Sequence, residues 1–101
     1  MFAKGDRYEG ELRNGKKEGY GEYFYSNGNK YEGLWSEDKK HGKGVYTYLL
    51  TGERYDGDWR DGLKQGKGRF DFSYGDYYEG DFDKGYKSGH GIIIFKSGAR
   101  F

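Results

Sequence analysis

Cysteine and proline are absent from the 101 residues, and Leu, Ile, Val and Ala together are scarce. Without cysteine the chain can form neither a disulfide framework nor a thiolate metal site, which is compatible with a reducing compartment. The longest apolar run covers only residues 92–95, far short of the ~20 residues with which a helix spans a bilayer. The shortage of aliphatic side chains excludes a thick aliphatic core.

An excess of charge of one sign is lacking as well. Eighteen Lys and Arg balance seventeen Asp and Glu, for a net charge of +1, so we expect no nucleic-acid partner. Residues 1–6 contain no apolar segment of the kind that a signal peptide needs. These absences predict a soluble, cytoplasmic chain.

Aromatic residues and glycine are abundant. The chain has 12 Tyr, 7 Phe, 2 Trp and 20 Gly, and an aromatic share of 21% argues against intrinsic disorder. Large rings that stack on one another can stabilise a thin β-sheet in place of a thick core. The composition therefore favours β-structure.

Internal repetition organises the chain. One sequence pattern occurs four times: it begins with Tyr, an acidic residue and Gly, and a Gly-x-Gly pair starts eleven residues after the Tyr. The Tyr residues that open the four copies, called openers below, are Tyr8, Tyr31, Tyr55 and Tyr78. They lie 23 or 24 residues apart, and a fixed period predicts a repeat array. We expect a single array over residues 1–101, with units of approximately 6–28, 29–52, 53–75 and 76–98 and half-units at 1–5 and 99–101.

The period of two within each unit predicts strands. Tyr31, Gly33 and Trp35 alternate with polar or smaller residues, and no helical spacing competes with this pattern. Each unit should contain a strand, a polar loop of about six residues, a second strand and a tight Gly turn such as Asn27-Gly28. The expected fold class is all-β: an open, twisted antiparallel meander of consecutive β-hairpins, with rings lying in the troughs that glycines leave on one face.

The four copies resemble the MORN repeat (membrane occupation and recognition nexus). Tyr31-Glu32-Gly33-Leu34-Trp35 carries its opening pattern, and Leu12 and Phe82 replace the Trp in two units. The resemblance covers essentially the whole chain. It implies a rod of about four units that binds or spaces other proteins and has no enzymatic activity of its own. Members of the family include cytoskeletal scaffolds, ciliary radial-spoke heads and junctional membrane proteins, as well as modules attached to lipid kinases and methyltransferases.

The aromatic face is the main candidate for partner binding, because a single sheet without covering helices cannot bury every ring. The alternative is that the rings serve only as the core of the sheet. The candidate residues are Tyr31, Trp35, Tyr46, Tyr48, Tyr55, Trp59, Phe70, Phe72, Tyr78 and Phe82.

Loop lysines are a second candidate, for contact with anionic phospholipids along one long edge of the sheet. Acidic residues such as Glu18 and Asp38 interleave with them, so an ordinary solvated surface is the alternative. The lysines are Lys16, Lys17, Lys39, Lys40, Lys64, Lys67, Lys84 and Lys87.

The remaining titratable residues indicate no chemistry. The acidic residues near each opener recur once per unit, which favours a solvated ladder paired with Lys or Arg on adjacent strands over paired catalytic carboxylates. His41 and His90 occupy different positions in their units and have no matching ligand set. We expect no catalytic residue, metal site or cofactor.

The function expected from these observations and the resemblance is a non-catalytic protein-protein interaction scaffold or spacer. It would be a structural component of a cytoskeletal or ciliary (axonemal) assembly and would bind partners through the aromatic face and the sheet edges. Edge strands near 1–4 and 99–101 would permit end-to-end self-association or strand addition. Two alternatives stay open: a peripheral membrane module, and a targeting module of a larger enzyme.

Overall fold

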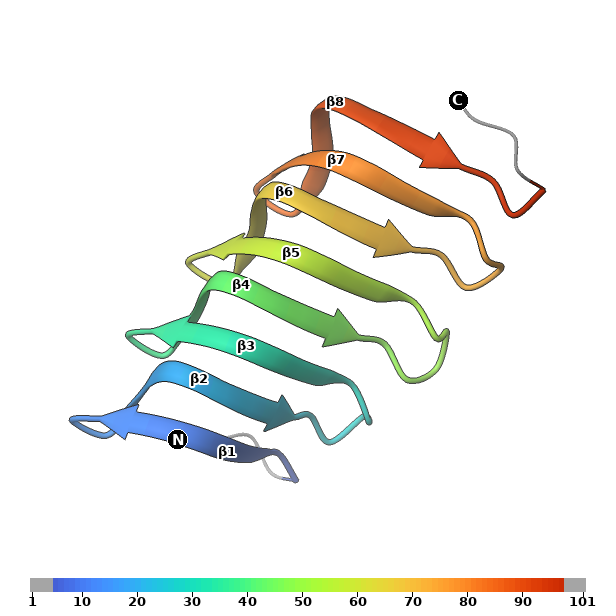
Figure 1. Ribbon diagram of the computed structural model, residues 1–101. Helices are drawn as coiled ribbons and strands as arrows, with labels where there is room; N and C mark the ends of the chain where they lie inside the picture. The colour runs from blue at the N-terminus through green and yellow to red at the C-terminus, as the bar shows by residue number, and fades with distance from the viewer. Residues whose placement is uncertain (1–4, 98–101) are drawn as a thin grey trace.

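A computed structural model describes residues 5–97, and within them the chain forms eight β-strands and no helix. All eight belong to one antiparallel sheet whose strand order follows the sequence (Figure 1). The body measures 47 × 26 × 17 Å. The strands are β1 (Arg7–Arg13), β2 (Lys16–Phe24), β3 (Lys30–Ser36), β4 (Lys39–Thr47), β5 (Arg54–Arg60), β6 (Leu63–Asp71), β7 (Tyr77–Asp83) and β8 (Tyr86–Ile94). This arrangement confirms the predicted meander.

Two sequence-based expectations cannot be compared with this structure. Apart from Gly5, the half-units predicted at 1–5 and 99–101 lie outside the described residues, as do the edge segments 1–4 and 99–101. Residues 5–97 contain no helix that is long and apolar enough to cross a bilayer.

The positions of the tight turns differ from the prediction. The expected six-residue polar loop within each unit is a two-residue turn, and the longer connection lies between units, at 25–29, 48–53 and 72–76. Asn14 and Gly15 have φ values of 52° and 78°, as a type I′ turn requires, and this turn matches the twist of the flanking strands. Below, a unit means two strands joined by such a turn: β1–β2, β3–β4, β5–β6 or β7–β8.

A bulge bends the second strand of every unit. In the second unit Gly33 pairs with Gly44 but Trp35 pairs with Lys40, so three residues of β4 lie opposite Leu34 alone. Gly42, within the bulge, has a φ of 95°, which a residue with a Cβ adopts only at a cost. The ribbons of β4, β6 and β8 turn sharply near their starts (Figure 1).

The opening Tyr of each unit lies over a pair of glycines, as the sequence predicted. A Cβ on Gly44 would lie 2.2 Å from the Tyr31 hydroxyl and 2.4 Å from its Cζ. The Tyr31 hydroxyl also donates a hydrogen bond to the Leu34 carbonyl at the bulge, at 2.7 Å. The openers Tyr8, Tyr55 and Tyr78 make the equivalent bond, to Glu11, Asp58 and Asp81. The glycine pair and the ring thus fix the bend together.

Consecutive units are joined by an aromatic side chain from the next unit. Trp59 of the third unit packs edge-on against Tyr31 of the second, with ring centroids 5.4 Å apart. Its indole N–H donates to the Gly44 carbonyl at 3.1 Å. Trp35 repeats this arrangement on Tyr8, and Phe82 takes the same place on Tyr55 without an N–H to donate.

Candidate partner-binding face

The predicted aromatic face consists of two parts with different exposure. Six of its ten residues belong to the buried core, together with Tyr23: Tyr31, Trp35, Tyr55, Trp59, Tyr78 and Phe82. The other four are only half-buried: Tyr46, Tyr48, Phe70 and Phe72. The interpretation of the rings as core holds for the first group, and a surface for a partner is available only at the second.

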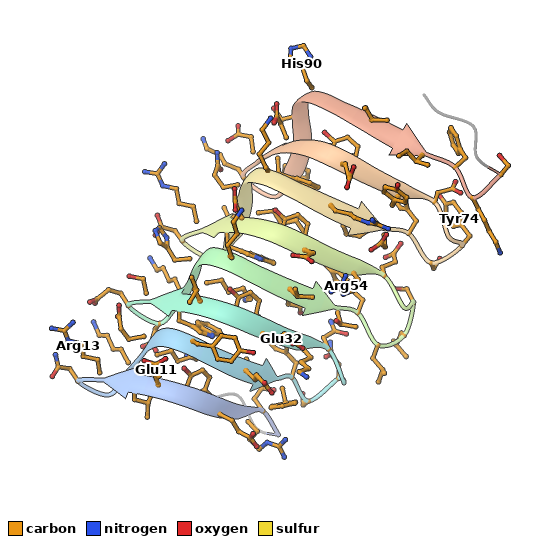
Figure 2. All side chains as sticks on the ribbon, in the orientation of Figure 1. Glu11, Arg13, Glu32, Arg54, Tyr74 and His90 are labelled. Carbon is orange, nitrogen blue, oxygen red and sulfur yellow. The ribbon has the colours of Figure 1, made fainter. Side chains whose placement is uncertain are left out.

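Five half-buried rings and the exposed ring of Tyr74 form one continuous row, which we call the aromatic strip: Tyr25, Tyr46, Tyr48, Phe70, Phe72 and Tyr74. Neighbouring ring centroids along this row lie between 4.7 and 6.1 Å apart. The last pair, Phe72 and Tyr74, is stacked with an interplanar angle of 15°. Figure 2 shows Tyr74 near the connection that leads out of β6. The strip therefore crosses from the first unit to the third.

Two members of the strip were missing from the sequence-based candidates. Tyr25 occupies the same place in its unit as Tyr48 and Phe72, so the repeated pattern already contained the signal that identifies it. Tyr74 lies in a connection between units, where it is 62% exposed. No repeat position marks Tyr74, because each connection between units has its own sequence.

A row of lysine ammonium groups accompanies the rings. Lys40 lies within 5.4–5.7 Å of five ring centroids, those of Tyr25, Tyr31, Trp35, Tyr46 and Trp59. Lys17 in the first unit, Lys64 in the third and Lys87 in the fourth are placed similarly. Such contacts between a cation and an aromatic face are attractive.

The lysines of this row differ in their polar partners. Lys17 donates to Asp38 at 3.2 Å, whereas Lys64 donates to the Tyr48 hydroxyl at 3.2 Å. No carboxylate of residues 5–97 lies within ion-pair distance of Lys40, Lys64 or Lys87. The strip is thus an apolar surface that carries uncompensated positive charge.

Burial shifts the pKa values of several groups on this face. Burial, followed by repulsion from Lys17 and Lys64, lowers the pKa of Lys40 to about 8. Burial also lowers the pKa of Lys64. The phenol pKa values of Tyr46 and Tyr48 are raised, again mainly by burial, so these hydroxyls stay neutral near pH 7.

The lysines do not form the single edge that the sequence suggested. Lys17, Lys40, Lys64 and Lys87 lie among the rings, while Lys67 is on the opposite face and pairs with Asp81. Lys16 and Lys39 are exposed on the strands next to the two-residue turns, and Lys84 lies in such a turn. The expectation was wrong because the predicted six-residue loop does not exist. Phospholipid contact itself stays a prediction.

The opposite face carries the charged residues, and its carboxylates do more than pair with cations. Asp58 and Asp81 pair with Lys43 and Lys67 on adjacent strands, as predicted. The same two carboxylates accept backbone N–H groups at the bulges, Asp58 from Lys67 and Asp81 from His90. Both interactions hold the pKa values of Asp58 and Asp81 below the usual range. These carboxylates therefore stabilise the bent backbone at the bulges by accepting its N–H groups.

The two histidines lie apart and have different surroundings. The backbone N–H of Asp61 donates to His41 Nδ1 at 3.4 Å, and His90 is exposed at the end of the sheet (Figure 2). Across residues 5–97 no group of three or more His, Asp or Glu side chains is placed to hold a metal ion.

Comparison with protein families agrees with the repeat geometry. The MORN repeat family model matches four consecutive segments, residues 8–30, 31–48, 55–77 and 78–100. Each segment begins at an opening Tyr, the residue that lies over the paired glycines. A search of curated proteins found no match.

Proposed function

Because the chain belongs to the MORN repeat family, we propose that it is a non-catalytic scaffold that binds a partner protein along the aromatic strip. MORN repeats occur generally in modules that bind proteins or membranes and are not themselves catalytic. The setting that we propose is a cytoskeletal or ciliary assembly, in the cytoplasm, because the family includes scaffolds of that kind.

The continuous aromatic strip is the observation that supports this proposal. Six neighbouring rings that are not fully buried form an apolar surface across three units, and such surfaces are typical of protein interfaces. Tyr and Phe are rigid, so binding through them costs little side-chain entropy. The repeated sheet beneath the strip holds its rings at fixed spacing.

Affinity capture with matched variants tests the proposal. Tyr48→Ala/Tyr74→Ala shortens the strip, and Tyr20→Ala removes an exposed Tyr from the opposite face. Proteins captured from a cytoskeletal extract should be retained by the Tyr20→Ala control and lost by the strip variant, as quantified by mass spectrometry and repeated with purified partners. If the strip variant retains the same purified partners with unchanged affinity, the proposal is wrong.

The membrane alternative has its own measurement. Vesicles of neutral phospholipid, with and without an anionic phospholipid, are sedimented together with the chain at low and high salt. We expect little pelleting, because Lys40 and Lys64 are half-buried among rings. Strong, salt-sensitive pelleting that survives in the strip variant would instead favour contact of the exposed lysines with a membrane.

A further inference from the structure

Each of the first three units has a site that holds an aromatic side chain of the next unit, and we call this site the socket. In the fourth unit no residue of 5–97 fills the socket. In the second unit Tyr31, Lys40, Gly44 and Tyr46 surround Trp59, the residue supplied by the next unit. The first unit holds Trp35 and the third holds Phe82 in the same way. In the fourth unit the corresponding residues, Tyr78, Lys87, Gly91 and Ile93, line a shallow hollow with nothing from residues 5–97 inside it.

The first unit presents the residue that fits such a socket. Leu12 stands where Trp35 and Trp59 stand in their units, and it is 60% exposed. The socket does not require a hydrogen-bond donor, since Phe82 fills the one on Tyr55 without an N–H, so the apolar side chain of Leu12 is chemically suited to it. Leu12 and the hollow beside Tyr78 are therefore the two halves of a contact that occurs three times inside the chain.

We propose that β1 of a second copy of this chain adds to β8, in the register of the β6–β7 pair, and places Leu12 in the socket of the fourth unit. This contact differs from the strip interface, so it does not rest on the proposed function.

The register of this joint follows from the repeat. Lys67 lies opposite Asp81 and Arg69 lies opposite Glu79 in the β6–β7 pair. One unit further along, the same positions are occupied by His90 and Ile92 of β8, which would lie opposite Glu11 and Glu9 of β1.

The side chains brought together in that register are compatible. His90 opposite Glu11 places an imidazole, which can donate an N–H, where Lys67 pairs with Asp81, and Ile92 opposite Glu9 resembles Val45 opposite Asp56. Gly91 would face Gly10, as paired glycines do throughout the sheet. No like charges would lie opposite each other. Figure 2 shows His90 and Glu11 at the two ends of the sheet.

The turn of the first unit can complete the joint. At each internal joint, the second residue of the two-residue turn donates its N–H to the carbonyl of the row lysine in the preceding unit. These bonds run from Asp38 to Lys17, from Gly62 to Lys40 and from Gly85 to Lys64, at 2.9–3.1 Å. Gly15 occupies the same turn position, and its φ of 78° is of the same sign. Its N–H would donate to the Lys87 carbonyl of the neighbouring copy.

Such a joint uses different surfaces on the two copies. A head-to-tail contact leaves one free β1 and one free β8 after each addition, so assembly continues with concentration instead of stopping at a dimer. The sheet edge supplies main-chain hydrogen bonds, and the socket fixes the register.

Sedimentation velocity across about two decades of concentration tests this joint. The weight-average mass of the chain should rise continuously with concentration. Leu12→Asp blocks the β1 end, and His90→Glu/Ile92→Glu places carboxylates opposite Glu11 and Glu9 and blocks the β8 end. Each variant alone should stay monomeric. Leu50→Asp, at a residue that is 90% exposed in a connection, is the control and should associate like the parent chain.

Mixing the two blocked variants gives the decisive measurement. Leu12→Asp keeps an intact β8 and His90→Glu/Ile92→Glu keeps an intact β1, so an equimolar mixture should form heterodimers and nothing larger. Circular dichroism and thermal unfolding establish that both variants are folded. A parent chain that stays monomeric throughout, association that survives Leu12→Asp, or a mixture that remains monomeric would each overturn the proposal.

Discussion

Replacing Lys40 by methionine should stabilise the protein near pH 7. The ammonium group of Lys40 is surrounded by five rings, and no carboxylate of residues 5–97 is paired with it. Burial and the neighbouring Lys17 and Lys64 lower its pKa from 10.5 to about 8. The charged form is therefore disfavoured in the folded state. Methionine retains the length of the side chain and packs well against aromatic rings.

The expected gain follows from the size of this shift. A shift from 10.5 to about 8 corresponds to roughly 3 kcal/mol of destabilisation, at about 1.4 kcal/mol per pKa unit. Attraction between the ammonium group and the rings offsets about 0.5–2 kcal/mol of this penalty, and the variant loses that attraction. Lys40→Met should therefore raise the free energy of unfolding by about 1–2.5 kcal/mol at pH 7.

The pH dependence of the stability difference between the parent chain and Lys40→Met shows whether the buried charge of Lys40 causes it. Below about pH 8, Lys40 is charged in both the folded and the unfolded chain, so the full penalty is present and does not vary with pH. Between about 8 and 10.5 only the unfolded chain binds the proton, so the stability of the parent chain rises with pH relative to the variant. Tyrosines with raised pKa values act in the opposite direction above pH 10, but they are common to both proteins.

Urea unfolding at pH 7, 8, 9 and 10 measures the difference between the two proteins. The advantage of Lys40→Met should shrink steadily above pH 8, whereas Lys39→Met, at the exposed neighbouring position, should change stability little at any pH. A variant that is less stable than the parent at pH 7, or a difference that does not vary with pH, would show that ring contacts outweigh burial at this site.

Three further substitutions test the packing of the units, each by urea unfolding at pH 7. Gly44→Ala should destabilise the protein by about 1–3 kcal/mol because its Cβ would collide with the Tyr31 ring, while Lys43→Ala on the opposite face should cost less than about 1 kcal/mol. Tyr31→Phe should cost about 1–2 kcal/mol, since the Leu34 carbonyl loses its donor; an unchanged midpoint would contradict this role. Phe82→Trp should add about 0.5–1 kcal/mol by supplying an indole N–H to the Gly68 carbonyl, as Trp59 does for Gly44, and a loss of stability would mean that the third socket is too small.

Most of the fold was predictable because it repeats. Each unit carries the same Tyr, the same glycine pair and the same alternation, so an error in one unit would be corrected by the other three. The contact between a Tyr ring and glycines was predictable as well, since only glycine leaves room for the ring. The turn within a unit is shorter than the predicted six-residue loop because a dipeptide such as Asn14-Gly15, a strong hairpin signal, closes it in two residues.

The position of the lysine row on the aromatic face could also be predicted from the sequence. Lys40 has the same parity as Gly42, Gly44 and Tyr46, and the bulge adds two residues to β4, which preserves that parity. Placing the strand start correctly at Lys39 is enough to put Lys40 on the face that carries the rings.

The sequence alone therefore determined the strand order, the period and the face on which each ring lies, because these depend on local spacing. Only the tertiary structure decided which rings are core and which form the aromatic strip. Tyr31 is fully buried because Trp59 of the next unit covers it, whereas Tyr48, whose ring centroid lies 6.1 Å from that of Phe70 in the next unit, stays half-buried. The exposure of a ring depends on the bend of the sheet and on the neighbouring unit, and neither can be read from the alternation within a single strand.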